Sequence, residues 1–142
     1  GELTFSNGQK YVGEFKYGKY NGKGSFYYGK SRLDFEKYEG FWKEGRIHGL
    51  GNYFYNHGDK YFGEFKNNQK HGFGKYIWFS KKEYIGEFLG DLIHGKGILT
   101  KIDGSIYIGE YKNGIAWKGI IYNEKRIPQW RIINSKKEKF FK

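Results

Sequence analysis

The chain has 142 residues and a formal net charge of +11; 23 residues are glycine and 22% are aromatic. That aromatic content excludes a disordered low-complexity chain, and the single proline excludes collagen, which needs proline throughout and glycine at every third position. The absence of cysteine excludes disulfides, thiolate metal sites and cysteine nucleophiles.

An internal repeat organises the sequence up to residue 123. Each repeat begins at a tyrosine, and successive tyrosines are separated by 27, 23, 23 and 23 residues. The five repeats begin at Tyr11, Tyr38, Tyr61, Tyr84 and Tyr107. Residues 1–10 fit the second half of a truncated repeat, because Gly1 precedes Tyr11 by ten residues, as Gly51 precedes Tyr61. Because position 1 is not Met, we expect an excised or processed start with further repeats upstream.

Glycine and aromatic residues recur at fixed offsets within each repeat. A glycine lies two residues after each tyrosine, and an aromatic residue two further on: Phe15, Trp42, Phe65, Phe88 and Tyr111. A pair of glycines two residues apart then follows in the first four repeats: Gly22 and Gly24, Gly49 and Gly51, Gly72 and Gly74, Gly95 and Gly97. Because side chains alternate along a strand, the first set shares one face, and the second set supplies a partner strand. Turn pairs such as Glu44-Gly45 lie between them, so each repeat is predicted to be a β-hairpin.

Stacked hairpins are the predicted fold. A single hairpin is marginally stable, so several must pack edge to edge. Short connections with turn pairs such as Asn7-Gly8 favour a meander. We predict an all-β, elongated, single-layer antiparallel meander of stacked β-hairpins, a solenoid with roughly ten or eleven strands. A large ring from the neighbouring hairpin is expected to lie flat over the strand glycines.

The repeat pattern changes in three places. The first repeat carries four extra residues around Lys30–Asp34, which we place in a loop at one edge. The fifth repeat has Lys118 and Ile120 in place of the glycine pair, so residues 107–123 are interpreted as a degenerate cap. Residues 124–142 leave the repeat as a basic C-terminal tail, with seven basic and two acidic residues. After Pro128, helix and strand fit this tail equally well.

The consensus Y-x-G-E-F-K-x-G-x-x-H-G-x-G-x-Y resembles the MORN (membrane occupation and recognition nexus) repeat family, from residue 1 to about residue 123. The resemblance implies a non-catalytic scaffold for protein–protein interaction, since proteins of this family occur in cytoskeletal assemblies, ciliary radial-spoke heads and cortical structures. It therefore implies a cytoplasmic, cytoskeleton-associated protein, in a cilium for example, with protein partners or a second copy as a homodimer. The family name implies an alternative, an acidic-phospholipid module that recruits or regulates an attached or partner enzyme.

Two sets of residues are candidates for binding. A single-layer sheet cannot bury both faces, so the aromatic ladder is expected to line a groove for a peptide, a helix or a second copy. Its candidate residues are Tyr11, Phe15, Tyr38, Trp42, Tyr61, Phe65, Tyr84, Phe88, Tyr107 and Tyr111. Candidate contacts with an acidic partner or an anionic membrane lie in the tail: Lys125, Arg126, Trp130, Arg131, Lys136, Lys137 and Lys139. The competing interpretation is a solvated lysine tail, or a cap with Trp130 packed on the last hairpin.

Catalysis, metal binding and cofactors are not expected. His48, His71 and His94 share one offset, but equivalent positions on neighbouring hairpins lie about 10 Å apart, too far for a shared metal. We expect these histidines to form structural hydrogen bonds, for which the recurring glutamates are candidate partners: Glu14, Glu64, Glu87 and Glu110. No phosphate loop or nucleophile elbow is present. Lysine and aromatic residues interleave as in single-strand binders, but the repeat already explains the aromatics, so nucleic acid is not expected.

Overall fold

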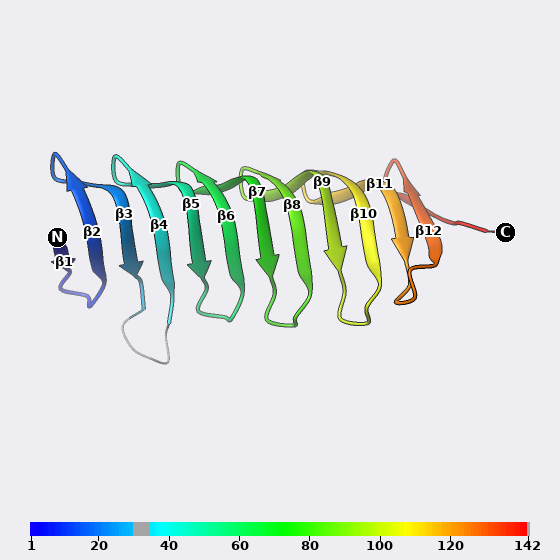
Figure 1. Ribbon diagram of the computed structural model, residues 1–142, viewed down its shortest axis with the longest axis horizontal. Coiled ribbons are helices and arrows are strands. Elements are labelled where there is room, and N and C mark those ends of the chain that lie inside the picture. Colours follow the sequence, from blue (N-terminus) through cyan, green and yellow to red (C-terminus); the bar gives the residue numbers. More distant parts are fainter. Residues whose placement is uncertain (30–34, 142) are drawn as a thin grey trace.

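The computed structural model describes residues 1–29 and 35–141, and these form a single sheet without helices. Thirteen strands follow one another in chain order, and neighbouring strands are antiparallel (Figure 1). The strands are β1 (Glu2–Thr4), β2 (Lys10–Lys16), β3 (Lys19–Tyr27), β4 (Lys37–Lys43), β5 (Arg46–Phe54), β6 (Lys60–Lys66), β7 (Gln69–Ile77), β8 (Glu83–Leu89), β9 (Leu92–Thr100), β10 (Ile106–Lys112), β11 (Ile115–Tyr122), β12 (Pro128–Ile133) and β13 (Lys136–Lys139). The predicted meander of stacked hairpins is confirmed. The loop expected around Lys30–Asp34 lies outside the described residues.

Each repeat forms a hairpin because its turn pair adopts the left-handed backbone conformation. In the first hairpin, Tyr17 and Gly18 have φ angles of 50° and 75° and connect β2 to β3. Positive φ at both central residues matches the right-handed twist of the flanking strands. Within the hairpin the strand glycines face each other, Gly13 opposite Gly24, and this pairing recurs in the later hairpins.

A bulge bends each of the first four hairpins immediately after the strand glycine. The register of β2 on β3 shifts between Gly13 and Phe15, and β4, β6 and β8 shift at the same point. A Cβ on Gly13 would lie 2.4 Å from the Cα of Gly24, so only glycine allows the two backbones to approach here. The bend brings the turn end of the hairpin over the ring of Tyr11, which stacks on Tyr20 with ring centroids 3.9 Å apart.

The first tyrosine of each repeat packs on the glycines of its own hairpin. A Cβ on Gly24 would lie 2.2 Å from the hydroxyl oxygen of Tyr11, so the ring lies directly against bare backbone. The Tyr11 hydroxyl donates a hydrogen bond of 2.8 Å to the carbonyl oxygen of Glu14, and the equivalent tyrosines do the same. The predicted ring on a glycine floor is confirmed. The prediction that the ring comes from the neighbouring hairpin is wrong, because the bulge carries the tyrosine over its own partner strand.

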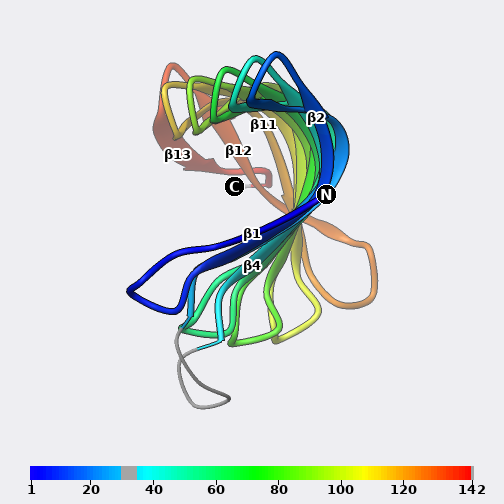
Figure 2. The same cartoon turned by 90° about the vertical axis from the view of Figure 1, so that its left-hand side faces the viewer.

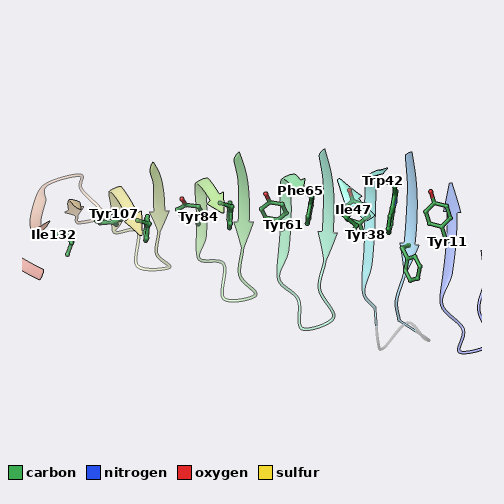
Figure 3. Packing of buried hydrophobic residues seen from close by; sticks show 12 residues of the cluster. Tyr11, Tyr38, Trp42, Ile47, Tyr61, Phe65, Tyr84, Tyr107 and Ile132 are labelled. Atoms are coloured by element: carbon green, nitrogen blue, oxygen red, sulfur yellow. The ribbon is translucent and has the colours of Figure 1, made fainter. Parts of the chain in front are cut away.

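Edge-to-face ring contacts join one hairpin to the next. Tyr38 contacts Trp42 of its own repeat at 5.2 Å between centroids and Phe65 of the next repeat at 5.3 Å. Tyr61 contacts Phe65 and Phe88 in the same way, at 4.9 and 5.1 Å. Figure 3 shows the resulting row of buried rings along the sheet. Edge-to-face geometry is favourable for aromatic pairs and adds to the area that they bury.

The segment interpreted as a tail continues the sheet. β12 pairs with β11, and β13 pairs with β12, so helix is excluded for residues 128–133 and 136–139. Ile132 faces Gly119 and is buried, at a position where the internal repeats pair glycine with glycine. These two strands also explain why the sequence estimate of ten or eleven strands falls below 13.

The sheet twists strongly along its length. Figure 2 shows the connections fanning around the long axis, so that the loop between β1 and β2 and the loop between β11 and β12 project on opposite sides. Twist of one hand accumulates from strand to strand in any sheet, and a single layer has nothing packed on it to flatten it. The surroundings of a given repeat position therefore change along the molecule.

Substitution of a floor glycine tests the packing of the core. Gly97→Ala places a methyl group 2.3 Å from the hydroxyl oxygen of Tyr84 and is expected to destabilise the fold by about 2–3 kcal/mol, a typical cost of overpacking. The matched control is Gly45→Ala in a turn, where φ is 83° and no atom lies within 4 Å of the new methyl group. Its expected cost is about 1 kcal/mol, from the backbone conformation alone. Urea unfolding midpoints measure both, and equal costs would contradict the role given to the tyrosine.

Candidate functional site

The aromatic ladder lies in the core of the sheet. Of its ten candidate residues, nine are buried, and only Phe15 is substantially exposed, at 39%. Tyr11, Tyr38, Tyr61 and Tyr84 have no exposed surface at all. Burial raises the pKa of Tyr11 and of Tyr84 to about 12, with a further contribution from the glutamate three residues on, so both hydroxyls remain protonated donors. The nine buried rings hold the hairpins together and are not accessible to a partner in the folded chain.

Lys70 introduces a charge among the core rings. It occupies the position that carries Tyr20, Ile47, Ile93 or Ala116 in the other repeats. Its Nζ lies 5.7 Å from the ring centroids of Tyr55 and Tyr76 and 3.4 Å from Oδ1 of Asp91. The lysine side chain is only 14% exposed, so the rings and the Asp91 carboxylate replace water as the surroundings of its ammonium group.

A partly buried tyrosine row lies beside the core, held by carboxylates. The hydroxyls of Tyr53 and Tyr76 donate hydrogen bonds of 2.5 Å to Glu36 and Asp59. Burial alone would raise the pKa of Asp59, but hydrogen bonds from Tyr76 and the backbone N–H of Phe79, together with the nearby His57, lower it. Burial and the Asp59 carboxylate raise the pKa of Tyr76. This arrangement anchors the connection between β5 and β6.

The recurring histidines and glutamates accept hydrogen bonds from backbone N–H groups, and no bond joins one set to the other among the described residues. Nδ1 of His48 and of His94 accepts from the N–H of Asn67 and Asn113, in the turn of the next hairpin. The recurring glutamates, such as Glu14, accept a hydrogen bond from the backbone N–H nine residues later, across the bulge of their own hairpin. The predicted structural role is therefore confirmed for the histidines and glutamates that accept these hydrogen bonds. The suggested pairing of histidine with glutamate is wrong. Within residues 1–29 and 35–141, no three acidic or histidine side chains are arranged to hold a metal ion.

The core tyrosines lie on one face of the sheet, and we call the opposite face the back face. An apolar groove lies on this back face. One row of paired positions crosses this face from Val12 through Ser25, Glu39, Asn52, Phe62 and Lys75 to four isoleucines, Ile85, Ile98, Ile108 and Ile120. The row is mixed in the first repeats and entirely apolar from β8 to β11. The four isoleucines line a groove of about 760 Å³, together with Phe73, Ile133 and Phe140. We call it the isoleucine groove.

The sequence analysis missed this groove. Its signal was an isoleucine directly after Tyr84 and Tyr107, and another just before Leu99 and Ile121. In a strand these neighbours point away from the tyrosine face. Ile85, Ile98 and Ile108 are 50%, 42% and 42% exposed, which is unusual for contiguous isoleucines on a surface.

The basic candidates of the C-terminal segment lie in the connection before β12 and on β12 and β13. Lys137 lies over the ring of Trp130 at 4.2 Å from its centroid, and Arg131 pairs with Glu138 at 3.0 Å. Arg126 donates a hydrogen bond of 2.9 Å to the carbonyl oxygen of Gly104. The remaining candidates are exposed: Lys125, Lys136 and Lys139. The cap interpretation of Trp130 is therefore the better description, since β12 adds to the sheet.

Exposed apolar side chains also lie in the connections between hairpins. Phe79 and Ile102 are each 74% exposed, and Ile127 is 48% exposed. Each has basic neighbours in sequence: Lys81 and Lys82, Lys101, or Lys125 and Arg126. These residues define a connection edge that carries both apolar and basic groups.

The stacked hairpins and their aromatic ladder define a β-hairpin repeat protein. A family model described as MORN repeat matches residues 11–31, 38–60, 61–81, 84–106 and 107–117, with each match starting at one of the five tyrosines. The chain belongs to the MORN repeat family, and the matched unit is a repeat module that is typically non-catalytic. Comparison with curated protein sequences finds no match. In the described part of the chain, no helix is long and apolar enough to cross a membrane.

The Asp59 anchor gives a pH-dependent prediction. Because the pKa of Asp59 is lowered in the fold, its carboxylate stabilises the protein above the unfolded pKa of about 4. That contribution is lost as the pH falls through the folded pKa. Asp59→Asn should lower stability by about 1–3 kcal/mol at pH 6, as for a weakened buried hydrogen bond, and should flatten the acid limb of a stability–pH curve.

Urea unfolding at a series of pH values measures both effects of Asp59→Asn. The matched control is Glu124→Gln, which removes an exposed carboxylate from another connection. If both variants keep the full acid sensitivity of the parent chain, Asp59 does not anchor the connection.

Proposed function

We propose that this chain is a non-catalytic scaffold that binds a protein partner through the back face of its sheet. The observation that carries the proposal is the isoleucine groove, where Ile85, Ile98 and Ile108 are about half exposed. Exposed contiguous apolar surface of this kind marks interaction sites in soluble proteins. A cytoskeletal or ciliary assembly and a cytoplasmic location are part of the proposal, and they rest on family membership.

The distribution of side chains on the two faces supports this choice of face. The tyrosine face closes on itself, since its rings stack over glycines and over one another. Among the described residues, the isoleucines of β8–β11 on the back face stay partly exposed, so their remaining surface is left to another molecule or segment to bury. Burial of a fully exposed side chain of this kind contributes about 1.5–3 kcal/mol, so covering these half-exposed isoleucines contributes roughly half of that for each.

A partner-capture experiment tests the proposal. The affinity-tagged chain should recover a stoichiometric protein partner from its native cells, and Ile98→Glu with Ile108→Glu should reduce recovery at least about tenfold, as expected for desolvating two charges in an apolar site. The matched control is Val12→Glu, on the same face and 38% exposed, but in β2 and outside the groove. Thermal unfolding confirms that the variants are folded. Failure to recover any stoichiometric partner would remove the scaffold proposal.

A second candidate function, binding to an anionic membrane, is favoured by the connection edge. Phe79, Ile102 and Ile127 project from the sheet beside basic residues, and the chain has a net charge of +11. Apolar side chains that insert at the headgroup level, with nearby lysines attracted to acidic lipid, are the usual elements of peripheral binding. In this version the module would recruit or regulate an attached or partner enzyme at the membrane.

Vesicle co-sedimentation tests the membrane function. The parent chain should sediment with vesicles containing phosphatidylserine at about 0.15 M salt, and Phe79→Ser with Ile102→Ser should abolish most of that binding. Ile98→Glu should leave it unchanged, because the groove lies on the back face and not at the connection edge. Absence of sedimentation of the parent chain at this salt concentration would exclude the membrane function.

A further inference from the structure

The isoleucine groove has a shape that restricts its occupant. Its four isoleucines lie on four successive strands, β8 to β11, in directly paired positions. Phe73 on β7 lies at one end, and Ile133 and Phe140 lie at the other. The groove therefore runs across the strands, and its apolar contacts repeat at the spacing between strands, about 4.8 Å.

We propose that the isoleucine groove binds an amphipathic α-helix with an acidic flank, lying across strands β8–β11. This inference rests on the proposed scaffold function and adds the chemistry and conformation of the partner segment. It also assigns the preference for an acidic flank to two residues of the groove rim, Lys96 and Lys118.

The spacing of the isoleucines favours a helix over an extended segment. Side chains on one face of a helix recur every three or four residues, about 4.5–6 Å along the axis, which matches the spacing of the strands. Side chains on one face of an extended segment recur at about 6.6–6.8 Å, so they lose register with the row within two or three contacts. The row spans about 15 Å, the length of a three-turn helix of about ten or eleven residues.

The charges of the groove rim favour an acidic flank. Lys96, Lys118 and Arg131 line the groove, against one carboxylate, Glu110. Arg131 is already paired with Glu138, and Glu110 lies between the two lysines in the ladder. The local excess of positive charge is small, but the whole chain adds a net charge of +11, which attracts an acidic partner at long range.

A second copy of the chain fits this groove poorly. Two back faces brought together would place Lys96 and Lys118 of one copy near the same basic rim of the other. They would also bring together two chains of net charge +11 each. A membrane fits poorly as well, because the isoleucines line a hollow of about 760 Å³, whereas the groups that project are those of the connection edge.

A displayed library of random 16-residue segments, selected on the purified full chain, tests the inference. Enriched segments should carry apolar residues at positions i, i+3 or i+4, i+7 and i+11, with an excess of Asp and Glu beside them. A synthetic peptide of an enriched sequence should gain helical circular dichroism on binding. Ile98→Glu should weaken its binding at least tenfold, and Val12→Glu should change it less than twofold.

The role of the rim is tested by two variants of equal net charge. Lys96→Glu with Lys118→Glu should weaken binding of the acidic peptide at least tenfold. The same variant should bind more tightly a peptide in which Lys replaces the acidic residues. Lys16→Glu with Lys43→Glu changes the net charge equally but lies in β2 and β4, far along the sheet, and should have at most a threefold effect at about 0.15 M salt. Thermal unfolding curves verify the fold of each variant.

The inference is overturned by a selection that enriches nothing, or by enriched segments that are basic or extended. It is also overturned if Ile98→Glu and Val12→Glu have equal effects. Recovery of a stoichiometric cellular partner would still support the scaffold function in those cases, so failure of the inference and failure of the function are distinguishable.

Discussion

The structure depends on one contact, a tyrosine ring lying directly on the bare backbone of two facing glycines. A single-layer sheet has no second layer on which to bury a face, so burial has to be created inside the layer itself. The glycine pair leaves room for the ring, the bulge beside it carries the turn end over that ring, and the hydroxyl reaches the carbonyl oxygen of the bulge residue. Rings of successive hairpins then meet edge to face. A core one residue thick thus extends along the whole molecule.

This contact also separates the two faces of the sheet by function. Because the tyrosine face is filled by its own packing, its packed positions carry glycine, aromatic or aliphatic residues, and Lys70 is an exception. Among the described residues the buried core belongs to the tyrosine face, so the side chains of the back face are free to differ from repeat to repeat. The row from Val12 to Ile120 shows this freedom, since it is mixed in the first repeats and entirely apolar from β8 to β11. Binding specificity is expected where the repeat is least regular.

The sequence predicted the hairpins, their stacking and the family, because these follow from glycine and aromatic residues at fixed spacing. It failed where the argument depended on which face a residue occupies in a bent strand. Tyr11 and its equivalents were chosen as a binding surface because they are aromatic and recurrent, but the bend at Gly13 encloses them. Ile98 and Ile108 were overlooked because neither belongs to the consensus. Trp130 and Ile132 were assigned to a tail because β12 lacks the repeat motif, although it pairs with β11.

Lys70 has a consequence for how the chain finds its fold. Near-identical hairpins can in principle pair in the wrong order, because each offers almost the same ring, glycines and edge to any other. Lys70 distinguishes the third repeat from the other copies. Its ammonium group needs the carboxylate of Asp91 from the next hairpin. In the other repeats the corresponding turn positions are Gly18, Gly45, Asn68 and Gly114. A slipped arrangement would leave that charge buried without its carboxylate, so one irregular residue penalises misassembly of the entire stack.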